Sequence, residues 1–482
     1  MKVKYTLGLS VIAILSLAEA AMAADDLASA FKEGNVTGEL RAYYINKAYT
    51  GDEYWRDGLA VGGKLGFITA PVSGISAGAL LYSTNKVDSI SPITKKNDKT
   101  LFNSNDKGYT YLGEMYINYQ KNNTVFKIGR QRLDTPLIGS DDASRMLPNL
   151  FEAAVLTNTD ISDTKIILGQ VTRIAYGTAS NAFGPYAYNL DMPTSSTNPY
   201  PGAKLGTQAL AYGYGAIYDP TKRSNGYHGM TAQVNYQNGD FQSMSGGAFG
   251  GNVSQEGVTM ASVVYEGVPH TKLQLWDYYL QDLFNTMYAQ GDYSWKCLLN
   301  PAVKMTASAQ YMQQNGVGSK EIGTIDSKYY GFQLQSLYKD IIFKAAYSGT
   351  GSNLNAINNG GVIAPWGGMN SFTYTQSTRD QYFADTKSYK LLTGYDFKNL
   401  TGYDFEASVS HARYMIGTEN DYVPGTTWNA KETDLDIKYN VESVKNLQVW
   451  LRSNYQRNFA PATATTNTVN NNEYRLEVNY KF

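Results

Sequence analysis

This chain has few cysteine and histidine residues and almost no net charge. A single cysteine, Cys297, excludes an intramolecular disulfide. The three histidines (His228, His270 and His411) form no cluster with metal-ligand spacing, and there is no G-x-S-x-G motif. Without a nucleophile and base set the sequence predicts no enzyme. A formal net charge of −1 over 482 residues gives no basic footprint for nucleic acid.

Long apolar runs are also missing, and a mean hydropathy of −0.37 argues against a long apolar helix. Lys2 and Lys4 precede an apolar stretch over residues 7–17, followed by Ala21-Met22-Ala23. This run is shorter than the about 20 residues that span a bilayer, which disfavours the alternative of an anchor helix. The pattern predicts a signal peptide over 1–23 and a mature chain over 24–482.

Tyrosine and glycine are abundant, with 40 and 45 residues, and the polar composition carries a repeated alternation. Near the C-terminus Tyr474, Leu476 and Val478 alternate with Glu473, Arg475 and Glu477. In a strand this period of two sends the two sets to opposite faces. The same pattern recurs in the segments 59–67, 303–311, 403–410 and 432–439. A dry core could not hold so many charges, so the pattern predicts an all-β transmembrane antiparallel barrel with a wet interior.

The connections between these segments alternate between short and long, which is typical of short periplasmic turns and long external loops. We expect 18 strands from about Gly34 to Phe482, with 20 as the alternative if residues 208–218 and 229–237 join the wall. In the segment 271–284 the alternation breaks between Leu275 and Trp276, through a bulge or through aromatics at the membrane rim. Five aromatics near segment ends are expected in the interfacial girdles: Tyr109, Tyr119, Tyr439, Tyr480 and Phe482.

Two stretches resemble the OprD family of substrate-selective porins, and a third, at the C-terminus, resembles the closing strand of outer-membrane barrels in general. They are GRQRLDTPLIGSDDASRMLPNLFEAAVLTNTDI at 129–161, the W-x-Y-Y-L-x-D-x-F pattern at 276–284, and the terminal EYRLEVNYKF. The resemblance implies an 18-stranded pore, single or as a loose homotrimer, with the third external loop folded into the lumen. It also implies that the final aromatic, Phe482, is the signal read by the barrel-assembly machinery.

Carried over to this chain, the third loop would run from Asp134 to Asn149. The expected constriction comprises Asp134, Asp141, Asp142 and Arg145, joined by Arg130 and Arg132 if the strand ends or bulges near Gly129. The alternative is that Asp141 and Asp142 only cap the backbone of their own loop. Charges expected on the pore wall, including a family ladder of bases, are Arg41, Lys64, Glu114, Lys127, Lys304, Lys344, Lys390, Asp404, Glu406, Lys438, Arg452 and Arg475.

The predicted function is passive diffusion of small hydrophilic solutes and ions across the outer membrane of a Gram-negative bacterium. The acidic pair at the constriction favours a mild preference for cations. No cofactor is expected, although Ca²⁺ could bridge acidic groups of the external loops. The alternative is a surface adhesin or structural barrel with an occluded lumen. A plugged, energised transporter is excluded because only about ten residues separate Ala24 from the first strand.

Overall fold

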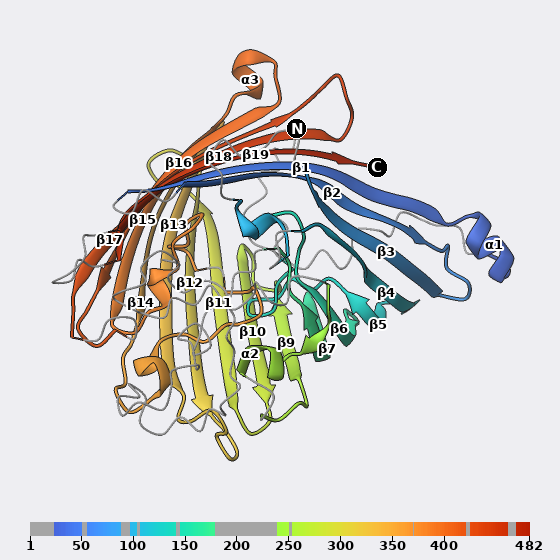
Figure 1. The fold of residues 1–482 in the computed structure, drawn as a ribbon, viewed down its shortest axis with the longest axis horizontal. Helices are drawn as coiled ribbons and strands as arrows, with labels where there is room; N and C mark the ends of the chain where they lie inside the picture. The colour runs from blue at the N-terminus through green and yellow to red at the C-terminus, as the bar shows by residue number, and fades with distance from the viewer. Residues whose placement is uncertain are drawn as a thin grey trace.

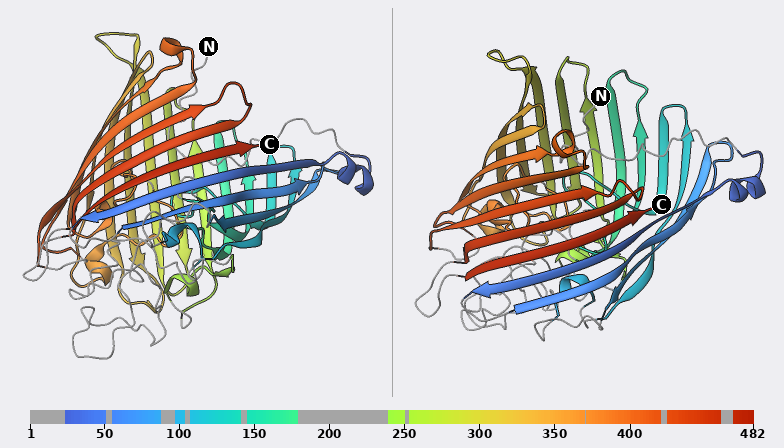
Figure 2. Two further views of the ribbon diagram at one scale, coloured as in Figure 1. Left: turned by 45° about the horizontal axis from the view of Figure 1, so that its top comes forward. Right: turned by 90° about the horizontal axis from the view of Figure 1, so that it is seen from above.

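The wall of the molecule is one antiparallel sheet that closes on itself (Figures 1 and 2). The computed structural model describes residues 24–50, 55–87, 97–103, 107–140, 145–178, 239–249, 253–369, 371–420, 425–460 and 469–482. The predicted signal peptide, Asp141, Asp142 and the candidate hairpin at 208–237 lie outside these residues.

Within the described residues nineteen strands form the sheet, and eighteen of them make the closed wall. The wall strands are β1 (Asn35–Thr50), β2 (Trp55–Ile68), β3 (Ile75–Lys86), β4 (Tyr109–Lys121), β5 (Thr124–Gln131), β6 (Leu150–Asn158), β7 (Thr164–Ala175), β9 (Val258–Tyr265), β10 (Thr271–Leu280), β11 (Phe284–Lys296), β12 (Val303–Gly316), β13 (Asp326–Tyr338), β14 (Ile341–Thr350), β15 (Thr386–Asp396), β16 (Phe405–Ile416), β17 (Trp428–Asn440), β18 (Leu447–Ala460) and β19 (Val469–Lys481).

The remaining strand, β8 (Gln242–Ser243), pairs only with the end of β7. Closure is made by β1 and β19, which run side by side in Figures 1 and 2. Because each wall strand pairs on both sides, the sheet has no free edge. The prediction of an 18-stranded antiparallel barrel is therefore confirmed.

The predicted alternation is visible in the exposure of the side chains. On β19 Tyr474 and Leu476 are exposed, whereas Glu473 and Glu477 are completely buried. The same parity holds on other strands, for example on β17, where Leu435 is exposed and Glu432 and Asp434 are buried. An apolar outer face and a charged inner face are what a barrel in lipid requires.

Short turns occupy one end of the barrel and most long connections the other. At the short end β4 and β5 are joined by Asn122 and Asn123, and β13 and β14 by Lys339 and Asp340. Asn122 and Lys339 both adopt a φ of 51°, as tight hairpin turns require. The strand ends that flank the long connections 87–108, 132–149, 176–257 and 351–385 lie at the opposite end.

Helices are few and short: α1 (Leu27–Lys32), α2 (Gly246–Phe249), α3 (Lys398–Thr401), η2 (Lys99–Leu101), η6 (Ile357–Gly360) and η7 (Asp380–Tyr382). None of the helices in the described ranges is long and apolar enough to cross a membrane. The α1 helix precedes β1 and lies outside the barrel, where Phe31 stacks on Phe67 at 6.0 Å.

Two details differ from the expectation. Residues 271–284 are not one interrupted strand, because β10 ends at Leu280 and a turn leads into β11. The register between β10 and both neighbours has no shift, so there is no bulge at Leu275 and Trp276. Leu275 faces outward and Trp276 faces an apolar part of the interior. Tyr109 is also buried in the interior, next to Tyr111, and is not a girdle residue.

The two-faced wall predicts that charge is tolerated on one side only. Leu476 lies midway along β19 with its side chain on the outer face. We expect Leu476→Arg to lower the free energy of unfolding of the barrel in lipid vesicles by about 2–4 kcal/mol, since a charge near the bilayer midplane is poorly solvated. Leu476→Ala is the control for lost apolar surface. Urea titration of both variants checks this, and equal losses would contradict the assigned lipid face.

Candidate functional site

The loop after β5 folds against the inner wall and meets a second inward loop. The Gly139 amide donates to the Trp366 carbonyl at 3.0 Å, and the Leu137 amide donates to the Tyr278 hydroxyl at 3.4 Å. A turn from Thr135 to Ile138 shapes the loop locally. We call five buried side chains the apolar plug: Leu133, Leu137, Ile138, Trp366 and Met369.

The apolar plug packs on aromatic side chains of β10 and β11. Trp276, Tyr278, Phe284 and Tyr288 are all buried beneath it, and the Trp366 ring stacks on Phe284 at 6.3 Å. Burial of this much aromatic surface contributes a large share of the loop's attachment energy. This sector of the barrel interior is therefore dry, which explains why Trp276, Tyr278 and Leu280, the inward residues at the long-loop end of β10, are aromatic or apolar.

The second half of the same loop reaches the opposite side of the barrel. Arg145 contacts Glu473 of β19 at 3.1 Å and donates from Nε to the Thr100 hydroxyl at 3.0 Å. Arg41 of β1 donates to the Arg145 carbonyl at 2.7 Å. The described parts of the loop therefore contact two opposite sides of the wall, β10 and the seam between β1 and β19.

At that seam lies a network of buried ion pairs. Lys47 Nζ is 2.6 Å from Glu473 Oε2, and Arg475 also pairs with Glu473. The Lys47 and Glu473 side chains are 1% and 0% exposed, so their charges are shielded from solvent. A buried carboxylate is stable only when cations compensate it. Glu473 has three: Lys47, Arg145 and Arg475.

The loop between β3 and β4 joins the same network through Asp98. Arg56 Nε is 3.2 Å from Asp98 Oδ2. Burial alone would raise the pKa of Asp98, but the positive charges of Arg56, Lys47 and Arg145 outweigh it. The pKa of Asp98 is therefore held below its ordinary value of 3.8, and the carboxylate is charged at neutral pH.

A third inward segment, residues 374–379, lies on the inner faces of β15 to β19. The amides of Ser377 and Thr378 donate to the Glu432 carboxylate at 2.9 and 2.6 Å. The Gln376 amide donates to Asp434 at 3.3 Å, and Lys390 donates to the Tyr374 carbonyl. These two wall carboxylates thus hold loop backbone in place.

The predicted constriction residues are only partly brought together. Arg145 lies in the seam network, and Asp134 pairs through its backbone with Gly139 within the inward loop. Arg132 donates to the Ser140 carbonyl at 3.5 Å, and Asp141 and Asp142 lie outside the described residues. Arg130 is opposite the outward-facing Met115 in register and pairs with Glu152 at 2.9 Å, away from the loop.

The predicted wall charges fall into separate groups. Arg41, Arg452 and Arg475 belong to one group of ion pairs, in which Arg452 lies 3.4 Å from Asp436 and 3.8 Å from Glu477. Glu406 and Lys438 pair with each other at 3.5 Å, and Asp404 lies in the turn before β16, 3.4 Å from Lys398. The others are spread along the wall: Lys64 on β2, Glu114 on β4, Lys127 on β5, Lys304 on β12, Lys344 on β14 and Lys390 on β15.

Sequence reasoning missed the residues that anchor the loops. Lys47, Arg56 and Asp98 carry no local pattern that marks them, because their partners are distant in the chain. The inward fold of residues 361–379 was also missed, since a Gly- and Thr-rich segment indicates only a loop. Within the described ranges no group of three or more His, Cys, Asp and Glu is placed to hold a metal ion.

The network predicts unequal effects for two glutamates of the wall. Glu473→Gln removes the shared counter-charge of three cations, and we expect a stability loss of about 3–5 kcal/mol. Glu406→Gln removes an exposed pair, for which about 0–1 kcal/mol is expected. The temperature at which each folded barrel loses its characteristic gel mobility checks the difference. Equal shifts would contradict the role of Glu473.

A pH effect is expected from Asp98. A carboxyl whose pKa is lowered by folding stabilises the folded state at pH values above its unfolded pKa. That stability is lost as the pH falls through the lower pKa of the folded state. The wild-type channel should therefore become noisier as the pH drops from about 5 towards 3, because protonation weakens the attachment of the loop. Single-channel recordings across this range check this. Asp98→Asn should show the noisy state already at pH 7, and an unchanged quiet trace would contradict it.

Comparison with known proteins agrees with this architecture. A family model described as outer membrane porin, OprD family, matches residues 29–204 and 227–482. A search of curated proteins by sequence gives no match.

Among solved structures, Pseudomonas aeruginosa OpdK with vanillate is similar at 17% identity and a TM-score of 0.68, over 94% of this chain and 99% of that one. Pseudomonas aeruginosa OccK9 (OpdG) is similar at 16% identity and a TM-score of 0.67, over 94% and 100%. Acinetobacter baumannii OccAB4 follows at 16% identity and a TM-score of 0.63, over 93% and 98%. With the family model matching most of its length, this chain belongs to the OprD family of outer membrane porins.

Proposed function

We propose that this porin passes small hydrophilic solutes and ions through a lumen narrowed by its inward loops, with a mild preference for cations. Channels of the OprD family lie in the Gram-negative outer membrane, and this chain shares that location and activity. The observation that carries the proposal is that inward segments are anchored on opposite sides of the wall: Arg145 and residues 374–379 hold to β15 to β19, whereas the loop around Leu137 holds to β10.

The cation preference follows from how the loop charges are used. Arg145 is 4% exposed and is committed to Glu473, so it contributes little field to the passage. Asp141 and Asp142 then dominate the charge of the third loop. Fixed charges at the narrowest point act on ions at close range.

The remaining features of the proposal follow from the barrel in its membrane. It has no catalytic activity and needs no cofactor, it contacts lipid with its outer face, and its final residue, Phe482, serves the assembly machinery. A signal peptide over 1–23 and a homotrimer are also part of the proposal. The similar OpdK structure is one with vanillate, an aromatic carboxylate, which makes vanillate a useful test solute here.

Planar-bilayer recording of the refolded protein tests the function directly. We expect discrete open steps and, under a salt gradient, a reversal potential that favours cations. Asp141→Asn with Asp142→Asn should move this potential towards zero, because the constriction loses two negative charges. Asp404→Asn with Glu406→Gln is the matched control at the turn end of the barrel, and it should leave the potential nearly unchanged.

Several outcomes would contradict the proposal. A folded barrel that gives no steps would favour an adhesin or structural role with an occluded lumen. A reversal potential that favours anions, or one that the Asp141 and Asp142 substitutions do not change, would reject the acidic constriction. Faster uptake of vanillate than of a cationic analogue into loaded vesicles would also speak against a cation preference.

A further inference from the structure

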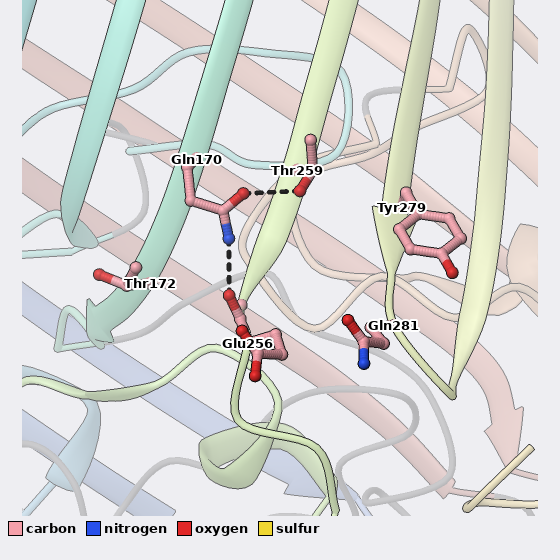
Figure 3. Close-up of a pocket in the computed structure, with 7 residues that line it drawn as sticks. Gln170, Thr172, Glu256, Thr259, Tyr279 and Gln281 are labelled. Atoms are coloured by element: carbon pink, nitrogen blue, oxygen red, sulfur yellow. Dashed lines mark hydrogen bonds between the residues drawn. The ribbon is translucent and has the colours of Figure 1, made fainter. Parts of the chain in front are cut away.

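A polar groove lies on the outer face of the barrel, where lipid is expected. It spans the ends of β7, β9 and β10 on the side of the long loops and has a volume of about 400 Å³. Figure 3 shows its polar side chains in front of the strands. The lining residues are Gln170, Thr172, Glu256, Gly257, Thr259, Tyr279 and Gln281.

The outward direction of these side chains follows from the strand parity. Thr259 is two and four residues from Ala261 and Val263 on β9, and Val263 is 44% exposed on the lipid face. Tyr279 has the parity of Leu275, which is 48% exposed. The apolar face formed by Val263 and Leu275 therefore gives way to the groove towards the long-loop end.

The groove is built by defined contacts. Gly257 adopts a φ of +81°, and a Cβ there would lie 2.3 Å from the Val171 carbonyl, so only glycine allows this corner to approach β7. Gln170 then bridges two strands, accepting from Thr259 at 2.6 Å and donating to the Glu256 carbonyl at 2.6 Å (Figure 3).

Two polar groups of the groove are left for a ligand. The Tyr279 hydroxyl and the Glu256 carboxylate have no hydrogen-bond partner among the described residues, and the Gln281 amide lines the same groove beside them. Just below, Asp277 accepts from Asn285 at 2.8 Å, also at outward-facing positions. Acyl chains offer no partner to such groups, and each unpaired polar group in hydrocarbon costs free energy.

We propose that this groove binds the saccharide portion of an outer-leaflet glycolipid, the lipopolysaccharide that lies against the long-loop end of an outer-membrane barrel. Amide, hydroxyl and carboxylate groups match sugar hydroxyls as donors and acceptors. The Tyr279 ring supplies an apolar face with a polar tip, as at membrane interfaces. A volume of about 400 Å³ lies within the about 300–1,000 Å³ of small-ligand sites.

The chemistry favours a glycolipid over a second copy of the chain. Contacts between two barrels would bury the exposed apolar band at Leu168, Val263 and Leu275, whereas the groove above it offers separate polar groups and one aromatic ring. Obligate protein interfaces are more apolar than this lining.

The test uses the refolded full chain in detergent with rough-type lipopolysaccharide, which carries core sugars, and with lipid A, which lacks them. Native mass spectrometry and a titration give the bound glycolipid and its affinity. We expect Tyr279→Ala with Gln281→Ala to weaken binding of the rough type about tenfold and to affect lipid A less. Tyr389→Ala is the matched control, an outward tyrosine that is 48% exposed on β15. Gln281→Ala alone, in a turn, is the second variant if the double variant folds poorly.

Equal binding by the groove variants and the control would overturn the proposal. So would a loss of trimer mass in the groove variants with glycolipid binding unchanged, because that outcome assigns the surface to a second copy. Conductance should be the same in all these variants, since the groove is outside the lumen. The result is thus independent of the test of the pore.

Discussion

The ion pair between Lys47 and Glu473 links the two requirements on which this barrel depends, closure of the sheet and attachment of the inward loop. The two residues are register partners across the seam of β1 and β19, the contact that closes the sheet. Glu473 also holds Arg145 of the inward loop. Closure is obligatory in lipid because an open edge would leave backbone groups without partners. The loop is thereby attached at the seam, where the first and last strands meet.

The interior of the barrel divides into two sectors with different chemistry. Over β10 and β11 the apolar plug covers buried aromatic side chains and excludes water. Over β15 to β19 and β1, carboxylates and bases pair with one another and with loop backbone. The inward loops are therefore held by buried charges on one side of the lumen and by neutral apolar packing on the other. This asymmetry is a property of the loops as much as of the wall.

The sequence predicted those features of the fold that depend on the alternation of residues along a single strand. Alternation along β19, at Glu473, Arg475 and Glu477, predicts an inner and an outer face without knowledge of any partner. The order of short turns and long loops then predicted the strand count. Tyr109 was misplaced because an inward tyrosine at a strand end has the same local pattern as a girdle tyrosine. Trp276 suggested a bulge because an apolar inner wall was not expected.

The contacts that shape the candidate site are of a different kind. Arg145 and Glu473 are 328 residues apart, and no spacing rule links them. Whether Arg145 faces the passage or the wall affects the sign of the electric field at the proposed constriction. In this fold Arg145 faces the wall because Glu473 is buried and needs compensation. The same buried carboxylate that holds the loop thus withdraws a positive charge from the passage, so the proposed cation preference depends on how the loop is anchored.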